Sequence, residues 1–415
     1  MKYVLKCGHL FDTDQKQFRP NANVYVCDHL IEKIEYDVPV CSGYDVVDLS
    51  NQYVLPGLID CHLHLNMNGE NHAFGSIASS LYGDLALKSY TYAMQDLMAG
   101  FTTLRDEGAV AYTDVALKNM INKGVVKGPR LFVSGKPLGT TGGHADSHFN
   151  PFITGEHSLG IVVDDEYSCK KAVRENLKWG ADQIKVMATG GVISFGDDPG
   201  APEFTQEELN AICEEARQKG HITSAHTHGA IGIKMAIKAG ITSIEHGTMM
   251  DEEGLQLMLE HGTYLVPTLI AGYHIMIHGK EAGIPDFIIE KCAEVVKTHV
   301  KSFQTAYKAG AKIAFGSDTG TPFSYHGAQA EEFEHMVKNG MTTCDAILSA
   351  TKVASELLRM EHQIGSVTEG KFADIIAVNT NPLDDISSLK TVDFVMKNGE
   401  IFKKNGCNQF PNLLY

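Results

Sequence analysis

The sequence predicts an α/β protein, a (β/α)8 barrel of the TIM type with a small β-sandwich domain built from both chain ends. Two observations predict this fold. Short β-rich runs separated by turns fill roughly the first and last fifty residues. The long middle part alternates apolar strand-like runs with amphipathic helix-like runs, as parallel βα units do. We place the β domain at residues 1–56 and 364–415 and the barrel at residues 57–363.

The amino-terminal runs, residues 3–10, 22–35 and 44–49, predict a small antiparallel sheet. Residues 365–378 and 392–403 have a similar composition near the other end of the chain. Within the last run, Asn398-Gly399 is the signal of a two-residue hairpin. We therefore expect the two ends to form one β domain together.

Eight runs in the middle part are candidate barrel strands, at residues 54–65, 101–106, 130–135, 183–188, 222–228, 243–246, 264–269 and 312–318. Residues 140–168 are expected to form a long loop. One crossover helix has clear ends, because Thr205 and Glu208 form a capping box and Gly220 stops it. A doubly wound open sheet would alternate in a similar way, so the strand count alone does not decide the topology.

The composition is that of an ordinary globular protein, with 415 residues, 43% hydrophobic and 21% charged. With 35 Lys and Arg against 51 Asp and Glu, the net charge of −16 argues against nucleic acid or anionic lipid as partners. No stretch approaches the ~18 apolar residues of a membrane span. Nine cysteines without a CxxC pair, and an amino terminus unlike a signal peptide, predict a cytoplasmic protein.

Residues that bind metals recur where the candidate strands end, the place where barrel enzymes collect their active sites. His62 and His64 are two residues apart, so both side chains leave the strand on the same side and can hold one ion. His226, His246 and Asp318 each close another apolar run. A single histidine of this kind is usually structural, but the whole set predicts a metal site.

Lys185 lies inside the apolar run Gln183–Met187, where an unpaired ammonium would be costly to bury. A neutral lysine amine can react with carbon dioxide to form a carbamate, and this anion could bridge two divalent ions. The alternative is a lysine that is ion-paired or that extends its ammonium to solvent.

As an ordered set, these motifs resemble the amidohydrolase superfamily, and within it the imidazolonepropionase-related group that includes prolidase-like and carboxypeptidase-like dipeptidases. The resemblance covers nearly the whole chain. It is carried by residues 55–64, Gly142-Gly143-His144, residues 184–191, His226, residues 244–247 and residues 316–318.

The resemblance implies a binuclear zinc site. In it His62 and His64 would hold the more buried ion, and His226 and His246 the more exposed one. Carboxylated Lys185 would bridge the two ions. Asp318 would be both a ligand of the buried ion and the catalytic general base, then general acid. The expected cofactors are two divalent ions, with carbon dioxide for Lys185.

The resemblance also suggests residues that bind substrate. His144 would contact the carbonyl or the terminal carboxylate of the substrate. His228 would contact the same carboxylate, although some relatives have tyrosine near the position of His228. Gly191, in a Gly-Gly pair, would let its loop pass close to the ligand; a plain turn explains these glycines equally well.

The leading hypothesis is a zinc-dependent hydrolase that cleaves the amide to a C-terminal amino acid in dipeptides or N-acyl amino acids. One alternative is a hydrolase or deaminase of a cyclic amide or amidine. Another is a non-catalytic oligomeric scaffold, which would have no need of the six ligands. The expected partners are a small-molecule or dipeptide substrate and, by resemblance, further copies of the chain in a homo-oligomer. Proline, basic and hydrophobic leaving residues all remain open.

Overall fold

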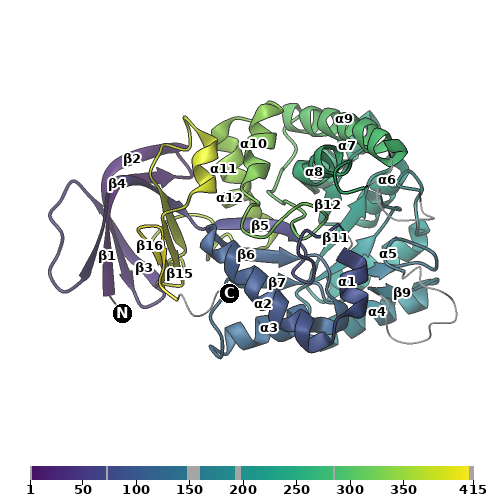
Figure 1. Ribbon diagram of the computed structural model, residues 1–415, viewed down its shortest axis with the longest axis horizontal. Helices are drawn as coiled ribbons and strands as arrows, with labels where there is room; N and C mark the ends of the chain where they lie inside the picture. Colours follow the sequence, from purple (N-terminus) through teal and green to yellow (C-terminus); the bar gives the residue numbers. More distant parts are fainter. Residues whose placement is uncertain (1, 72, 147–158, 192–197, 284–285, 411–415) are drawn as a thin grey trace.

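The computed structural model describes residues 2–71, 73–146, 159–191, 198–283 and 286–410. Figure 1 shows a sheet at the left, built from purple amino-terminal and yellow carboxyl-terminal strands, beside a larger part in which helices surround strands. This arrangement confirms the predicted α/β class with a β domain made from both chain ends. The domain boundaries at residues 56/57 and 363/364 stay predictions.

The β domain contains one hydrogen-bonded sheet of eight strands in the order β17-β16-β15-β14-β4-β1-β2-β3. Strand β1 pairs antiparallel with β2 but parallel with β4, so the amino-terminal strands are not purely antiparallel as predicted. The reason is that the chain returns from β3 to the other edge of β1 before β4 begins. The strands are β1 (Lys2–Asp12), β2 (Gln17–Cys27), β3 (Leu30–Tyr36), β4 (Asp45–Pro56), β14 (Ile375–Val378), β15 (Phe394–Lys397), β16 (Glu400–Lys404) and β17 (Cys407–Asn408).

Both halves of this sheet share one hydrophobic core, in which Leu5 and Val24 from the first half are clustered with Ile375 and Phe394 from the second. The backbone N–H of Ile31 in β3 donates to the carbonyl of residue 371, just before β14. The edge strand β3 therefore lies against the segment that leads into the other half of the sheet.

The barrel strands run parallel in two groups. The first contains β5 (Leu58–Leu63), β6 (Phe101–Asp106) and β7 (Arg130–Val133); the second contains β8 (Leu138–Gly139), β9 (Ile161–Val162), β10 (Gln183–Met187), β11 (Ile222–Thr227), β12 (Ser243–His246) and β13 (Tyr264–Val266). Asp182 N–H donates to the carbonyl of Val133 at 2.7 Å, which joins the two groups on one side.

Residues 312–318, the eighth predicted strand, close the barrel without forming a regular ladder. Leu265 N–H donates to the carbonyl of Lys312, and Cys61 N–H to that of Phe315, both at 2.9 Å. This segment therefore lies between β13 and β5. Asp318 is the last residue of this segment and therefore lies at the same rim of the barrel as the last residues of β13 and β5.

Two predicted segments differ in the structure. The run 54–65 is divided between β4 and β5, because a Cβ on Gly57 would lie only 2.1 Å from Thr102 Oγ1, so this close crossing into the barrel needs glycine. The expected loop 140–168 ends earlier than predicted. Asp165 caps helix α4 (Glu166–Trp179) by accepting the Ser168 N–H at 2.7 Å.

Helices cover the outside of the barrel (Figure 1). The predicted cap of α5 (Gln206–Gln218) is confirmed, since Glu208 N–H donates to Thr205 Oγ1 and Thr205 N–H to the Glu208 carboxylate. The other helices are α1 (Ala73–Ser79), α2 (Tyr82–Met98), η1 (Val110–Tyr112), α3 (Thr113–Asn122), α6 (Ala230–Ala239), α7 (Glu252–His261), α8 (Leu269–His278), α9 (Asp286–Lys308), α10 (Glu331–Lys338), α11 (Thr343–Ser349), α12 (Lys352–Leu357) and η2 (Ile386–Lys390).

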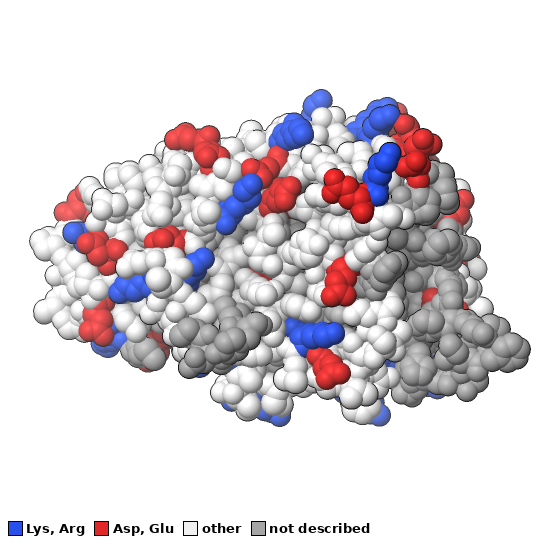
Figure 2. Space-filling model, in the orientation of Figure 1, with Lys and Arg blue, Asp and Glu red and all other residues white. Residues whose placement is uncertain are grey.

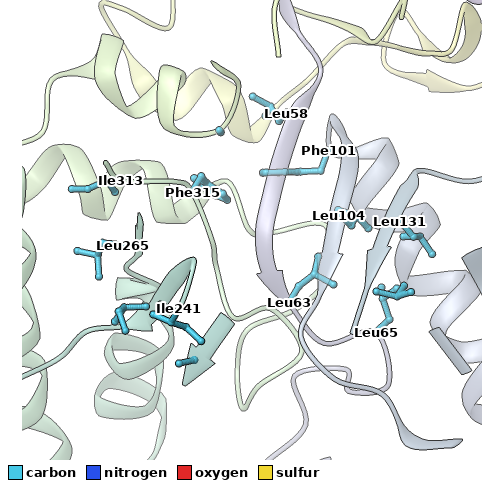
Figure 3. Close-up of a cluster of buried hydrophobic side chains, with 14 of the residues drawn as sticks. Leu58, Leu63, Leu65, Phe101, Leu104, Leu131, Ile241, Leu265, Ile313 and Phe315 are labelled. Atoms are coloured by element: carbon cyan, nitrogen blue, oxygen red, sulfur yellow. The ribbon is translucent and has the colours of Figure 1, made fainter. Parts of the chain in front are cut away.

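Apolar side chains from the barrel strands and from the helices around them form one large buried cluster. Figure 3 shows Leu63 and Phe101 from β5 and β6 on one side and Leu265 and Phe315 on the other, and all four are buried. Because the barrel strands are parallel, their carboxyl ends meet at one rim, where the polar residues of the sequence motifs are placed.

On the face in Figure 2, the Lys and Arg side chains are interspersed with Asp and Glu rather than gathered into a basic patch. Within the described ranges, no helix has the length and apolar character that crossing a bilayer requires.

Candidate functional site

Six residues singled out in the sequence line one pocket at the carboxyl ends of the strands. His62 belongs to β5, His226 to β11 and His246 to β12. His64 directly follows β5, and Asp318 is the last residue of the closing segment 312–318. The sixth residue, Lys185, is in β10. Residues spread over more than 250 positions of sequence are thus brought to one place, as the strand-end pattern predicts.

Two groups of side chains are close enough to share an ion. The first is His62, His246 and Asp318, and the second is His226, His228 and His246, with the nitrogen and oxygen atoms of each group within 4.8 Å of one another. Asp318 Oδ1 lies 3.5 Å from His62 Nε2 and 3.3 Å from His64 Nε2. His246 belongs to both groups, so the two potential ion sites adjoin each other.

The backbone at two of these residues is unusual. His246 has φ of 67° and Asp318 φ of 58°, the left-handed region that residues with a Cβ rarely adopt. Such strained conformations are often found where a side chain is held in place for function. His246 and Asp318 are two of the three members of the first group.

The protonation states favour metal binding. Burial lowers the pKa of His62, His226 and His246 well below 6.5, so these rings are neutral near pH 7 and can ligate through nitrogen lone pairs. His226 Nε2 is buried and has no hydrogen-bond partner among the described residues. A neutral histidine set with an orphaned nitrogen and a nearby carboxylate fits a divalent metal ion.

Oxygen atoms behind the rings fix their orientation. His62 Nδ1 lies 2.8 Å from the Glu245 carboxylate, His246 Nδ1 2.7 Å from Thr268 Oγ1, and His228 Nδ1 2.7 Å from Thr248 Oγ1. In each case the other nitrogen, Nε2, is turned away from this partner. Partners of this kind commonly set the tautomer and ring orientation of metal-ligating histidines.

Below the histidines, Lys185 and Arg105 are buried beside two carboxylates. Lys185 Nζ is 2.9 Å from Glu107 Oε2. Arg105 contacts Glu107 at 2.9 Å and donates to both oxygens of Glu245 at 2.8 and 2.9 Å. Two cations thus balance two carboxylates inside the barrel. In this arrangement Lys185 is an ion-paired lysine, the alternative to a carbamate that the sequence left open.

Glu107, Arg105 and Glu245 are not among the residues predicted from the sequence. A signal for Glu107 was available, because it directly follows the predicted strand 101–106, and His62 and Asp318 also lie near the carboxyl ends of predicted strands. Glu245 precedes His246 and looks like part of its motif. Arg105 gives no clear signal, since its partners Gln183, Ser243 and Glu245 lie in other strands.

The three predicted substrate residues occupy different positions. His144 lines the pocket and stacks on His226 with ring centroids 4.5 Å apart. His228 also lines the pocket and belongs to the second potential ion group. Gly191 is buried but is not among the described residues that line this pocket; Gly190 lines a second cavity beside Gly142 and Gly143.

Comparison with known proteins points to one family. The family model "Amidohydrolase family" matches residues 53–402. The chain is 33% identical to ochratoxinase of Aspergillus niger over 428 aligned positions, which cover 97% of this chain and 87% of ochratoxinase. It is 25% identical to imidazolonepropionase of a Geobacillus species, covering 93% and 91% of the two chains.

Among solved structures, a Xaa-Pro dipeptidase with methionine bound in its active site superposes with a TM-score of 0.89. Its sequence is 37% identical, and the match covers 97% of this chain and all of the dipeptidase. These findings confirm the resemblance inferred from the motifs. The chain belongs to the amidohydrolase family and is a hydrolase that acts on carbon–nitrogen bonds.

Proposed function

We propose that this protein is a binuclear zinc-dependent hydrolase that releases the C-terminal amino acid from dipeptides or N-acyl amino acids. The observation that carries the proposal is the convergence of His62, His64, Lys185, His226, His246 and Asp318 on one pocket. The ochratoxinase and Xaa-Pro dipeptidase relatives support an amide substrate.

The buried charges link a bridging carbamate on Lys185 to metal binding. With Lys185 as an ammonium, two cations and two carboxylates balance. Carboxylation would replace a positive charge by a negative one beside Glu107. That excess of negative charge is stable in a dry interior only if cations join the site. Two divalent ions would compensate both the carbamate and Asp318.

When bound, the ions supply Lewis acidity that activates water and polarises the amide carbonyl. Asp318 is the proton carrier. Burial tends to raise its pKa, but the hydrogen bond with His64 and the neighbouring positive charges, including that of Lys185, together outweigh this effect, and the pKa is lowered. The ionised carboxylate accepts a proton from the attacking water and then delivers it to the nitrogen of the departing amino acid.

His144 and His228 would orient the substrate from the same side of the pocket, through its carbonyl or its terminal carboxylate, and Gly191 would give the adjoining loop a close approach to it. The second ion group offers another role for His228, as a ligand next to His226 and His246. We further propose a cytoplasmic homo-oligomer, on the basis of the cysteine pattern and the family resemblance.

The test is amino-acid release from a panel of dipeptides and N-acyl amino acids by zinc-loaded protein prepared with bicarbonate. We expect release by the wild type, loss of at least about 100-fold in Lys185→Ala, and no change in Lys234→Ala, a lysine that pairs with Asp251 on the surface. Removal and return of zinc in the wild type separates a chemical loss from a folding defect.

Silence of the whole panel despite two bound ions would contradict the proposal. Ring opening or ammonia release from cyclic amides would then favour the alternative hydrolase. Silence with no bound metal would favour the scaffold.

A further inference from the structure

The pocket above the histidines has apolar walls. The first wall contains Met67, Ile77 and Val110, which come from the segment after β5, from α1 and from η1. These three side chains are buried and pack together with Leu85 in one hydrophobic cluster. The wall is therefore a continuous apolar surface backed by further apolar side chains.

The second wall is formed by α8 and α9, with Ile275 from α8 and Val295 and Val296 from α9 lining the pocket. The helices approach each other closely at Gly272, where a Cβ would lie 3.0 Å from Val296 Cγ2. The amino-terminal end of α8 is fixed because the Glu332 carboxylate accepts the backbone N–H groups of residues 269 and 270. This wall is therefore held by packing and by hydrogen bonds.

The charged side chains among the described lining residues, apart from histidine, are Glu107, Lys185 and Asp318. Each already has partners. Glu107 accepts hydrogen bonds from Gln183 and Ser224 and pairs with Lys185, and Asp318 lies against His62 and His64. Among the described lining residues, an additional charge on the substrate would thus find no partner of its own, and burying it against these walls would be energetically costly.

Building on the proposed function, we propose that the site selects substrates with an uncharged apolar group on each side of the scissile amide. The preferred class is N-acyl derivatives of apolar amino acids. Dipeptides with a free α-ammonium and N-acyl derivatives of basic amino acids are poor substrates. The terminal carboxylate is common to all these compounds, so it does not affect the ranking.

Two matched substrate pairs test this preference in the zinc-loaded wild type. N-propionyl-phenylalanine differs from Ala-Phe only by lacking the α-ammonium group, and N-propionyl-norleucine differs from N-propionyl-lysine only by lacking the ε-ammonium group. We expect kcat/KM to be at least about 100-fold higher for the uncharged member of each pair, because the ammonium must be desolvated without a partner.

Variants locate the effect. Val110→Asp places a carboxylate in the first wall, and Val296→Asp places a carboxylate in the second wall. Each new carboxylate can pair with a substrate ammonium, so each variant should reduce the kcat/KM ratio of one substrate pair by at least about 10-fold. The control is Val125→Asp, which makes the same substitution at a surface residue that is 66% exposed and should leave both ratios unchanged. The wild-type ratios decide the proposal even if a wall variant fails to fold.

The possible results are distinguishable. Ratios near one, or a preference for the charged member, would overturn this inference and leave the proposed function standing. No release from any of the four compounds by protein with two bound ions would overturn the proposed function and this inference with it.

Discussion

Glu245 connects the metal-ligand set to the buried charges, because its carboxylate accepts from both Arg105 and the His62 ring. The exchange Glu245→Gln keeps the shape but removes the charge that orients His62. We expect zinc affinity to fall about 10- to 100-fold, as for other partners of metal-ligating histidines. Competition with a chromophoric chelator measures the affinity.

The matched control for this prediction is Glu253→Gln, which alters an exposed carboxylate paired with Lys234. Its zinc affinity should equal that of the wild type. Equal affinities for Glu245→Gln and the wild type would show that His62 is oriented by other contacts.

At the scale of single residues, the sequence predicted those site residues that are marked by their immediate neighbours in the chain. His62, His64 and Asp318 stand at the ends of apolar runs, and parallel strands bring such ends together whatever the details of packing. The role of Arg105 could not be predicted, because it depends on Glu245, which Arg105 contacts only in the closed barrel.

At the scale of elements, the Asn398-Gly399 signal predicted the hairpin between β15 and β16 correctly. Both residues have positive φ, 50° and 72°, as a type I′ turn requires. A Cβ on Gly399 would also lie 1.8 Å from the carbonyl oxygen of Asp28 in the neighbouring turn. Glycine is therefore needed there for two independent reasons.

We predict that Gly399→Ala lowers the free energy of unfolding by about 2–5 kcal/mol, from the sum of backbone strain and overpacking. Gly43→Ala is the control, since Gly43 also has positive φ but no atom lies within 4 Å of the place that a Cβ would take there. That exchange should cost only about 1–2 kcal/mol. Equal losses in urea denaturation would show that the contact with Asp28 is unimportant.

Element boundaries were less predictable than element types. The run 54–65 reads as one strand, yet it crosses from the sheet domain into the barrel at Gly57. Residues 312–318 also read as a strand, but they close the barrel through a few hydrogen bonds without a regular ladder. Both outcomes are set by neighbouring chain segments rather than by local residue preference.

At the scale of the whole molecule, the buried pair His326 and Asp96 ties together α2, the segment after β5 and the approach to α10. His326 Nδ1 lies 2.9 Å from the Asp96 carboxylate, and Nε2 the same distance from the Met67 carbonyl. Burial lowers the pKa of His326, but the charge and hydrogen bond of Asp96 and the hydrogen bond to the Met67 carbonyl together outweigh burial, and the pKa is raised above 6.5.

A raised pKa means that the folded protein binds this proton more tightly than the unfolded chain does. The pair therefore contributes its full stability below pH 6.5, and the contribution is lost as the pH rises through the pKa of the folded state. We predict that His326→Ala costs about 3–5 kcal/mol at pH 6 and less at pH 9, measured by urea denaturation. The control His362→Ala removes a 93% exposed ring and should show no such trend. A cost that is the same at both pH values would contradict this assignment.

Six residues from distant parts of the chain are proposed to form one hydrolytic metal centre, and a zinc titration is the decisive measurement. Metal-free protein in bicarbonate buffer is titrated with zinc while phenylalanine release from N-propionyl-phenylalanine is followed. We predict that the rate rises to a plateau at two ions per chain and stays at background in Lys185→Ala. A plateau at one ion, or two bound ions without release from any amide of the panel, would contradict the proposal.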